Sequence, residues 1–156
     1  MNTNSWFMVL GVNKFTIDKL EDFGSDTVNG FVYKITNVHT GKIYIGKKTL
    51  KFIRKKKITQ KVKKATGTRK TYERSVTESD WKEYYGSSKE LQTDVVKYGK
   101  QAFTREILEL CCSKKYLSYA EIAWQIKYDV LKRASYNGNI LGRYYLKDME
   151  NCNNGK

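Results

Sequence analysis

Two tyrosines at a short spacing, followed by a glycine and a dense basic run, form the stretch of this sequence best suited to chemistry. Tyr33 and Tyr44 lie in the segment GFVYKITNVHTGKIYIG, residues 30–46, which ends at Gly46. A phenol hydroxyl can orient water or a phosphate. It accepts a proton at neutral pH only if nearby cations lower its pKa from about 10. A catalytic role for the two hydroxyls therefore requires elements that bring them together beside cations.

The segment around the tyrosines predicts two short strands. Apolar or aromatic residues alternate with polar ones over Phe31 to Asn37 and again over Lys42 to Gly46. Between these runs, Gly41 can adopt the positive φ that a tight turn requires. An ordinary β-hairpin satisfies this pattern as well as a functional one does.

The charge balance points to a polyanionic partner. Lysine and arginine total 30 against 16 aspartates and glutamates, a formal net charge of +14. Such an excess indicates nucleic acid as the commonest partner. The sequence has no long apolar run or lipidation signal that would favour a membrane.

Histidine and cysteine usage excludes several classes of site. His39 is the only histidine, which rules out mechanisms that need a histidine pair. The three cysteines, Cys111, Cys112 and Cys152, have no CxxC spacing. A disulfide framework or a zinc site is therefore not expected, and an intracellular, reducing compartment fits better.

Residues 47–74 contain the densest positive charge. Such a run is either a solvated loop or a segment that contacts phosphates, and a mobile basic loop can do both. Leu50, Phe52 and Ile53 predict one helical turn near its start. The candidate nucleic-acid-binding residues are Lys47, Lys48, Lys51, Lys55, Lys56, Lys57, Lys61, Lys63, Lys64, Arg69 and Lys70.

The remaining elements predict an α+β domain. Ser88 can cap a helix over Lys89 to Tyr98 that Gly99 ends, with Leu91, Val95 and Val96 on one face. The other expected elements are a strand over residues 6–12, a short helix or turn over 16–23, a strand over 103–110, a strong helix over 118–133 and a strand over 140–146.

The tyrosine segment resembles the signature of the GIY-YIG nuclease family. Phe31-Val32-Tyr33, ten intervening residues and Tyr44-Ile45-Gly46 match it, except that Phe31 stands where the family usually has glycine. Gly86-Ser87-Ser88, Lys97-Tyr98-Gly99 and Phe103 resemble phage-type members in the same order. The resemblance implies a three-stranded antiparallel sheet flanked by helices and a metal-dependent, homing-endonuclease-like DNA endonuclease that uses Mg²⁺ or Mn²⁺. In a phage protein the compartment would be the host cytoplasm. The nuclease domain would span 30–147 with a basic insertion at about 55–80, an N-terminal extension over 1–29 and a polar tail over 148–156.

The resemblance also assigns roles to individual residues. Tyr33 would activate water with its pKa lowered by Lys47, Arg54 and a metal, and Tyr44 would orient water or phosphate. Arg54 would stabilise the phosphoryl charge, and Glu121 would hold the metal. Asn137 occupies the position of the family's late asparagine, and Tyr85 is the candidate for the family's additional histidine, tyrosine or lysine.

Structural alternatives exist for several of these residues. Ser118 and Glu121 fit an S-x-x-E capping box, in which Glu121 would only satisfy a backbone N–H, and Asp129 is then the alternative acid. Asn137 precedes Gly138, a common turn pair, and Asn139 could replace it. At the level of function, Phe31 favours a non-catalytic nucleic-acid-binding module. A basic adaptor for acidic proteins would leave the tyrosines unexplained.

Overall fold

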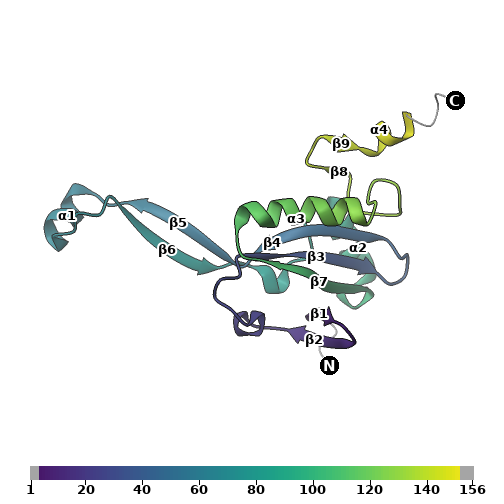
Figure 1. Ribbon diagram of the computed structural model, residues 1–156, viewed down its shortest axis with the longest axis horizontal. Coiled ribbons are helices and arrows are strands. Elements are labelled where there is room, and N and C mark those ends of the chain that lie inside the picture. The colour runs from purple at the N-terminus through teal and green to yellow at the C-terminus, as the bar shows by residue number, and fades with distance from the viewer. Residues whose placement is uncertain (1–3, 152–156) are drawn as a thin grey trace.

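The computed structural model describes residues 4–151, and residues 1–3 and 152–156 lie outside that range. A central sheet carries helices on both faces, and a long hairpin projects from one end (Figure 1). The strands are β1 (Trp6–Leu10), β2 (Asn13–Ile17), β3 (Gly30–Asn37), β4 (Ile43–Thr49), β5 (Lys51–Lys57), β6 (Tyr72–Glu78), β7 (Phe103–Cys111), β8 (Asn139–Ile140) and β9 (Tyr144–Tyr145). The α-helices are α1 (Gln60–Thr66), α2 (Lys89–Tyr98), α3 (Lys114–Lys127) and α4 (Leu146–Asn151), with 3₁₀ turns at Leu20–Phe23, Trp81–Glu83 and Lys100–Ala102.

The central sheet has five strands in the order β2-β1-β7-β3-β4. The expected three-stranded antiparallel sheet is present as β7-β3-β4. It is nevertheless only part of the sheet, because β1 adds in parallel to β7 and β2 pairs with β1. The α+β class is therefore confirmed, and the three-stranded count is wrong. The parallel β1–β7 pairing joins distant parts of the chain, so no local sequence pattern predicts it.

Each face of the sheet has its own core. Phe31, Tyr33 and Ile35 point to the face covered by α2 and the N-terminal segment, where they pack with Trp6 and Trp81. Val32, Ile43 and Ile45 point to the face covered by α3. The hairpin alternation predicted from sequence is thus an alternation between two buried faces. It fixes which side of β4 each site residue occupies.

Phe31 is a core residue. Its side chain is fully buried and lies 5.1 Å from the Trp6 ring and 5.8 Å from the Phe23 ring, measured between centroids. The N-terminal strand supplies Trp6, which also packs against Tyr33 at 5.3 Å. An aromatic side chain in place of glycine is therefore accommodated by packing from the N-terminal segment and does not intrude on the face of β4 that binds α3.

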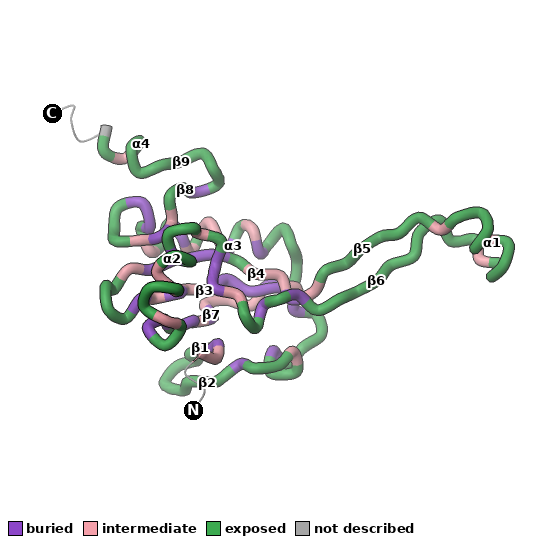
Figure 2. Tube along the Cα trace, turned by 180° about the vertical axis from the view of Figure 1, so that it is seen from behind, coloured by how far each residue is buried: buried purple, intermediate pink, exposed green. Residues whose placement is uncertain are grey.

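Residues 51–78 form a projecting arm in place of the expected loop. β5 and β6 pair over seven positions, and α1 closes the tip (Figure 1). Every residue of β6 is exposed, as are those of β5 after Lys51 (Figure 2). The expected helical turn at Leu50–Ile53 is wrong: Phe52 and Ile53 belong to β5, and Leu50 is buried at the root. There the Ser79 hydroxyl donates a 2.5 Å hydrogen bond to the Thr49 carbonyl.

The helix signals in the sequence predict α2 correctly and α3 less well. Ser88 caps α2 through the Leu91 amide and Gly99 ends it, although Val96 is exposed and does not share the buried face of Leu91. α3 is capped by Ser113, begins at Lys114, four residues before the expected start, and ends at Lys127, six residues before the expected end. The expected last strand over 140–146 is the short hairpin of β8 and β9. The expected polar tail begins inside α4, and its residues 152–156 lie outside the described range.

Candidate active site

A pocket of about 580 Å³ opens at the outer edge of β4. β4 is the last strand of the sheet, and the chain from Ala134 to Asn137 hydrogen-bonds along its outer edge. Three elements surround that edge: the Ser87–Ser88 entry to α2, the middle of α3, and the chain from Tyr136 to Gly142. Of the residues predicted from sequence, Tyr44, Lys47, Glu121 and Asn137 line this pocket.

Gly46 makes room for the two tyrosines. It lies opposite Tyr33 in the β3–β4 register, and a Cβ added to it would lie 2.6 Å from the Tyr33 hydroxyl and 2.9 Å from the Tyr44 ring. The Tyr44 hydroxyl reaches the pocket, where it is 2.8 Å from the Ser87 hydroxyl. Tyr33 lies behind, only 1 % exposed, and its hydroxyl is hydrogen-bonded to Tyr84. Glycine at position 46 is therefore required by the close approach of both rings.

The pKa of Tyr33 is raised well above its ordinary value. Burial is the main cause, and the neighbouring phenols of Tyr44 and Tyr84 add to it. The expectation that cations lower the Tyr33 pKa is therefore wrong for this arrangement, because burial disfavours a phenolate. A phenol in this state is protonated at neutral pH and donates a hydrogen bond.

Glu121 and Lys47 face each other across the pocket. The Lys47 ammonium lies 2.9 Å from the Glu121 carboxylate and donates a 3.0 Å hydrogen bond to the Ser118 hydroxyl. Both partners are partly exposed, at 39 % for the Lys47 side chain and 21 % for Glu121. The capping-box alternative is excluded, because Ser113 caps α3 and Ser118 lies inside the helix. Asp129 follows the end of α3 with a left-handed backbone. It lines a different, apolar pocket.

Asn137 binds the chain that follows α3 to the edge of β4. Its amide oxygen accepts from the Ile45 N–H at 2.9 Å, and its amide nitrogen donates to the Ile45 carbonyl at 2.7 Å. The Ser135 hydroxyl donates to the same side-chain oxygen at 3.1 Å. Gln125 on α3 also donates to the Ile45 carbonyl at 3.2 Å. The Asn137 amide thus pairs with β4 as a neighbouring strand would, directly between Tyr44 and Gly46.

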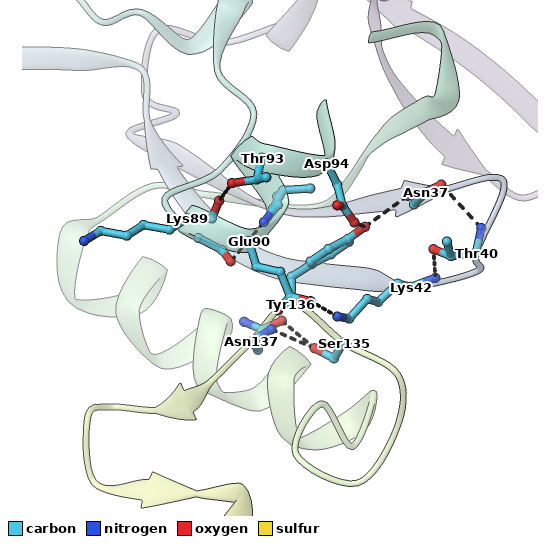
Figure 3. Close-up of polar contacts among 12 residues, drawn as sticks. Asn37, Thr40, Lys42, Lys89, Glu90, Thr93, Asp94, Ser135, Tyr136 and Asn137 are labelled. Atoms are coloured by element: carbon cyan, nitrogen blue, oxygen red, sulfur yellow. Dashed lines mark hydrogen bonds and ion pairs between the residues drawn. The ribbon is translucent and has the colours of Figure 1, made fainter. Parts of the chain in front are cut away.

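Tyr136 ties the same segment to α2 (Figure 3). Its hydroxyl donates to Asp94 at 2.7 Å and accepts from the Asn37 side chain at 3.0 Å. The Lys42 ammonium lies 4.7 Å from its ring and forms an ion pair with Glu90 on α2. The wall of the pocket is therefore held on both sides, by β4 and by α2.

A family model described as "Putative endonuclease segE, GIY-YIG domain" matches residues 14–148, most of the chain. The chain belongs to this GIY-YIG family. The family implies a nuclease with DNA as its substrate, and GIY-YIG nucleases typically use a divalent metal ion. No curated protein and no solved structure matches the chain significantly. Within residues 4–151, no helix is long and apolar enough to cross a membrane.

Two residues expected in this GIY-YIG site lie elsewhere. Arg54 is exposed on β5, opposite Ser75 in the arm, and is not among the residues lining the pocket. Tyr85 faces a separate pocket, where the Arg105 guanidinium lies 4.4 Å from its ring. Its neighbour Tyr84 instead contacts Tyr33, and both Tyr84 and Ser87 belong to the hydroxyl network. A choice between adjacent tyrosines depends on which way each side chain points, and spacing in the sequence does not carry that information.

The donor set of this GIY-YIG pocket suits a magnesium-type ion that is held mainly by water and substrate. Residues 4–151 contain no group of three histidine, cysteine, aspartate or glutamate side chains that could enclose a metal. Mg²⁺ commonly binds through one or two carboxylates and completes its shell with water and phosphate oxygens. Glu121, a partly exposed carboxylate in an open pocket, fits that arrangement.

Proposed function

We propose that this chain is a metal-dependent DNA endonuclease that hydrolyses phosphodiester bonds in the pocket at the edge of β4. The observation that carries the proposal is the convergence of Tyr44, Lys47 and Glu121 on that pocket. A hydroxyl, a cation and a carboxylate are three of the groups that hydrolysis of a phosphodiester requires. The family match, which spans the tyrosine motif and Glu121, supports the same reaction.

Each pocket residue has a role that follows from its contacts. The Tyr44 hydroxyl, hydrogen-bonded to Ser87, orients the attacking water or a phosphate oxygen. Lys47, whose side chain is 39 % exposed beside Glu121, supplies positive charge to the phosphate. Glu121 would hold Mg²⁺ or Mn²⁺, and the ion when bound stabilises developing negative charge and the leaving oxygen.

Tyr33 and Asn137 act through other residues in this proposal. Tyr33 is hydrogen-bonded to Tyr84 and packs against the Tyr44 ring, and these contacts hold the hydroxyl network behind Tyr44. Asn137 fixes the edge of β4 through Ile45 and so holds Tyr44 and Gly46 in place. Both are positioning residues, since neither arrangement leaves the phenol or the amide directed at a phosphate.

The test is incubation of the protein with supercoiled plasmid in Mg²⁺, in Mn²⁺ and in EDTA, beside the Glu121→Gln variant. We expect metal-dependent nicking or linearisation by the wild type and none by the variant, with DNA binding retained. The substitution keeps the size of the side chain and removes its charge. Full cleavage by Glu121→Gln would remove Glu121 from the metal role. Ser118→Ala is a matched control on α3, because it removes a hydrogen-bond partner of Lys47 without removing the carboxylate.

A non-catalytic nucleic-acid-binding module is the second candidate. The observation that favours it is the Lys47–Glu121 ion pair, which occupies the carboxylate that the ion would need. In that function the wild type would bind DNA and never cut it with either metal. The plasmid assay therefore separates the two functions directly.

A further inference from the structure

The arm carries a large share of the positive charge of the molecule. Residues 51–78 contain eleven lysines and arginines against two glutamates, within a chain of formal charge +14. One of the two glutamates, Glu78, is engaged at the root, where it accepts from Trp81 and faces Lys82. The ion pairs of the described residues include no lysine or arginine of the arm.

The two faces of the arm differ in charge. Residues directly opposite in an antiparallel pair share a face. One face carries Lys55 opposite Arg74 and, next along, Lys57 opposite Tyr72. The other face pairs Arg54 with Ser75 and Lys56 with Glu73. The first face, which we call the cationic face, is defined by Lys55, Lys57, Tyr72 and Arg74.

Lys55 opposite Arg74 is unfavourable for the arm by itself. Like charges directly opposite on neighbouring strands destabilise a sheet, whereas opposite charges stabilise it by roughly 0.2–1 kcal/mol. A two-stranded hairpin is only marginally stable in water. The repulsion between Lys55 and Arg74 therefore lowers a stability that is already small. Residues that destabilise their own element, as this pair does, are expected at functional sites.

We infer that the cationic face of the arm is a docking surface for the phosphate backbone of duplex DNA. The inference rests on the proposed function, because the cationic face would bind the DNA that the nuclease cleaves. Charge complementarity selects the occupant, and a bound phosphate would offset the repulsion between Lys55 and Arg74.

Shape favours a duplex over a single strand. A two-stranded β-ribbon fits the major groove of B-form DNA. Seven residues per strand give the ribbon a length of about 23 Å, well within one turn of duplex. Proteins that hold single strands stack bases on a series of aromatic side chains. The strands of the arm offer two, Phe52 and Tyr72, one on each face.

The test is a substitution that should help the arm fold and harm its binding. Lys55→Glu places a carboxylate opposite Arg74, so the arm gains a favourable cross-strand pair. We expect unfolding of the variant in urea to need at least as much denaturant as the wild type. We also expect its affinity for a 30-base-pair duplex in EDTA to fall. The dependence of log K on log salt should become shallower by about 0.9 for each phosphate that the arm no longer neutralises.

Two controls separate local charge from total charge and from fold. Lys97→Glu makes the same charge change on exposed α2, and we expect its salt slope to equal that of the wild type. The exchange Lys55→Arg with Arg74→Lys keeps both cations and should bind as the wild type does.

If Lys55→Glu and Lys97→Glu lower affinity equally, the arm is not the docking surface. If the wild type binds single-stranded DNA of the same sequence as tightly as duplex, the duplex assignment is wrong. Metal-dependent cleavage by a Lys55→Glu variant whose binding is unchanged would refute this inference and leave the proposed function intact.

Discussion

Tyr44 reaches the pocket and Tyr33 does not, although the two tyrosines match equivalent halves of one motif. Tyr44 lines the pocket, whereas Tyr33 is buried behind Gly46 and bonded to Tyr84. We therefore expect Tyr44→Phe to slow single-turnover cleavage by about 10²- to 10³-fold, the usual cost of removing one positioned hydrogen-bond donor. Tyr33→Phe should slow it less, although the family resemblance gave Tyr33 the role of activating water. Equal losses in both variants, with wild-type binding in EDTA, would return Tyr33 to the chemistry.

The raised pKa of Tyr33 also predicts a pH dependence of stability. The folded state favours the neutral phenol, so its contribution is fully present below the unfolded pKa of about 10 and is lost as pH rises toward the higher folded pKa. Urea unfolding of the wild type should be nearly constant from pH 7 to about 8 and should decline above about pH 9, because burial also raises the pKa of Cys111, to about 11. The decline should be shallower in Tyr33→Phe, and unchanged in Tyr119→Phe, because Tyr119 is 66 % exposed.

Lys47 competes with the metal for Glu121 in the proposed site. Lys47→Gln removes the ammonium 2.9 Å from the carboxylate, so less Mg²⁺ should be needed for half-maximal cleavage. The same substitution removes positive charge from the pocket, so the maximal single-turnover rate should fall. A magnesium titration measures both quantities. A variant that needs more Mg²⁺ than the wild type would show that Lys47 supports metal binding.

At the scale of elements, the strand β4 is shaped by one glycine. Gly46→Ala would place a Cβ 2.6 Å from the Tyr33 hydroxyl, and overpacking of this kind costs about 1–3 kcal/mol. Removing that hydroxyl in the background of Tyr33→Phe should recover part of the loss. A double-mutant cycle measured by urea unfolding gives the coupling. Strictly additive effects would mean that the ring, not the hydroxyl, sets the limit.

The sequence predicted elements whose signals are local and missed those that depend on distant partners. The β3–β4 hairpin and the caps of α2 at Ser88 and Gly99 follow from neighbouring residues, and both are present. β1 joins β7 in parallel across most of the chain, and no nearby residue marks that pairing. The arm was missed because its strands bury nothing, so alternation between polar and apolar residues carries no signal.

The residues of the candidate site likewise divide into those that local sequence signals predicted and those that depend on the fold. Tyr44, Glu121 and Asn137 were predicted from their places in the motif and near the strong helix, and they line one pocket, while their roles stay predictions. Arg54 was placed by its distance from Gly46, but the chain turns outward into β5 after Thr49, so that distance leads away from the pocket. The ion pair between Lys47 and Glu121 joins β4 to α3, and only the folded sheet brings the two together.

The molecule consists of a body, built on the central sheet and containing the pocket, and of the arm that projects from it (Figure 1). The root of the arm is fixed independently of its length, because Leu50 is buried and accepts from the Ser79 N–H at 2.8 Å. The residues beyond this root, 52–57 and 72–78, are exposed. The arm can therefore be shortened without opening either core.

We expect a variant in which Asn-Gly replaces residues 54–75 to fold with the stability of the wild type. A two-residue Asn-Gly turn closes an antiparallel hairpin, and Ile53 and Val76 already face each other at the point of closure. The variant should bind duplex DNA more weakly and with a shallower salt dependence. Its single-turnover rate at saturating DNA should stay close to that of the wild type, because loss of binding shared by substrate and transition state raises KM and spares kcat. The measurement is the cleavage rate as a function of DNA concentration, beside Arg54→Gln in the full-length arm. If both variants lose the plateau rate, Arg54 reaches the phosphate during the reaction, and the arm must fold back toward the edge of β4 when DNA binds.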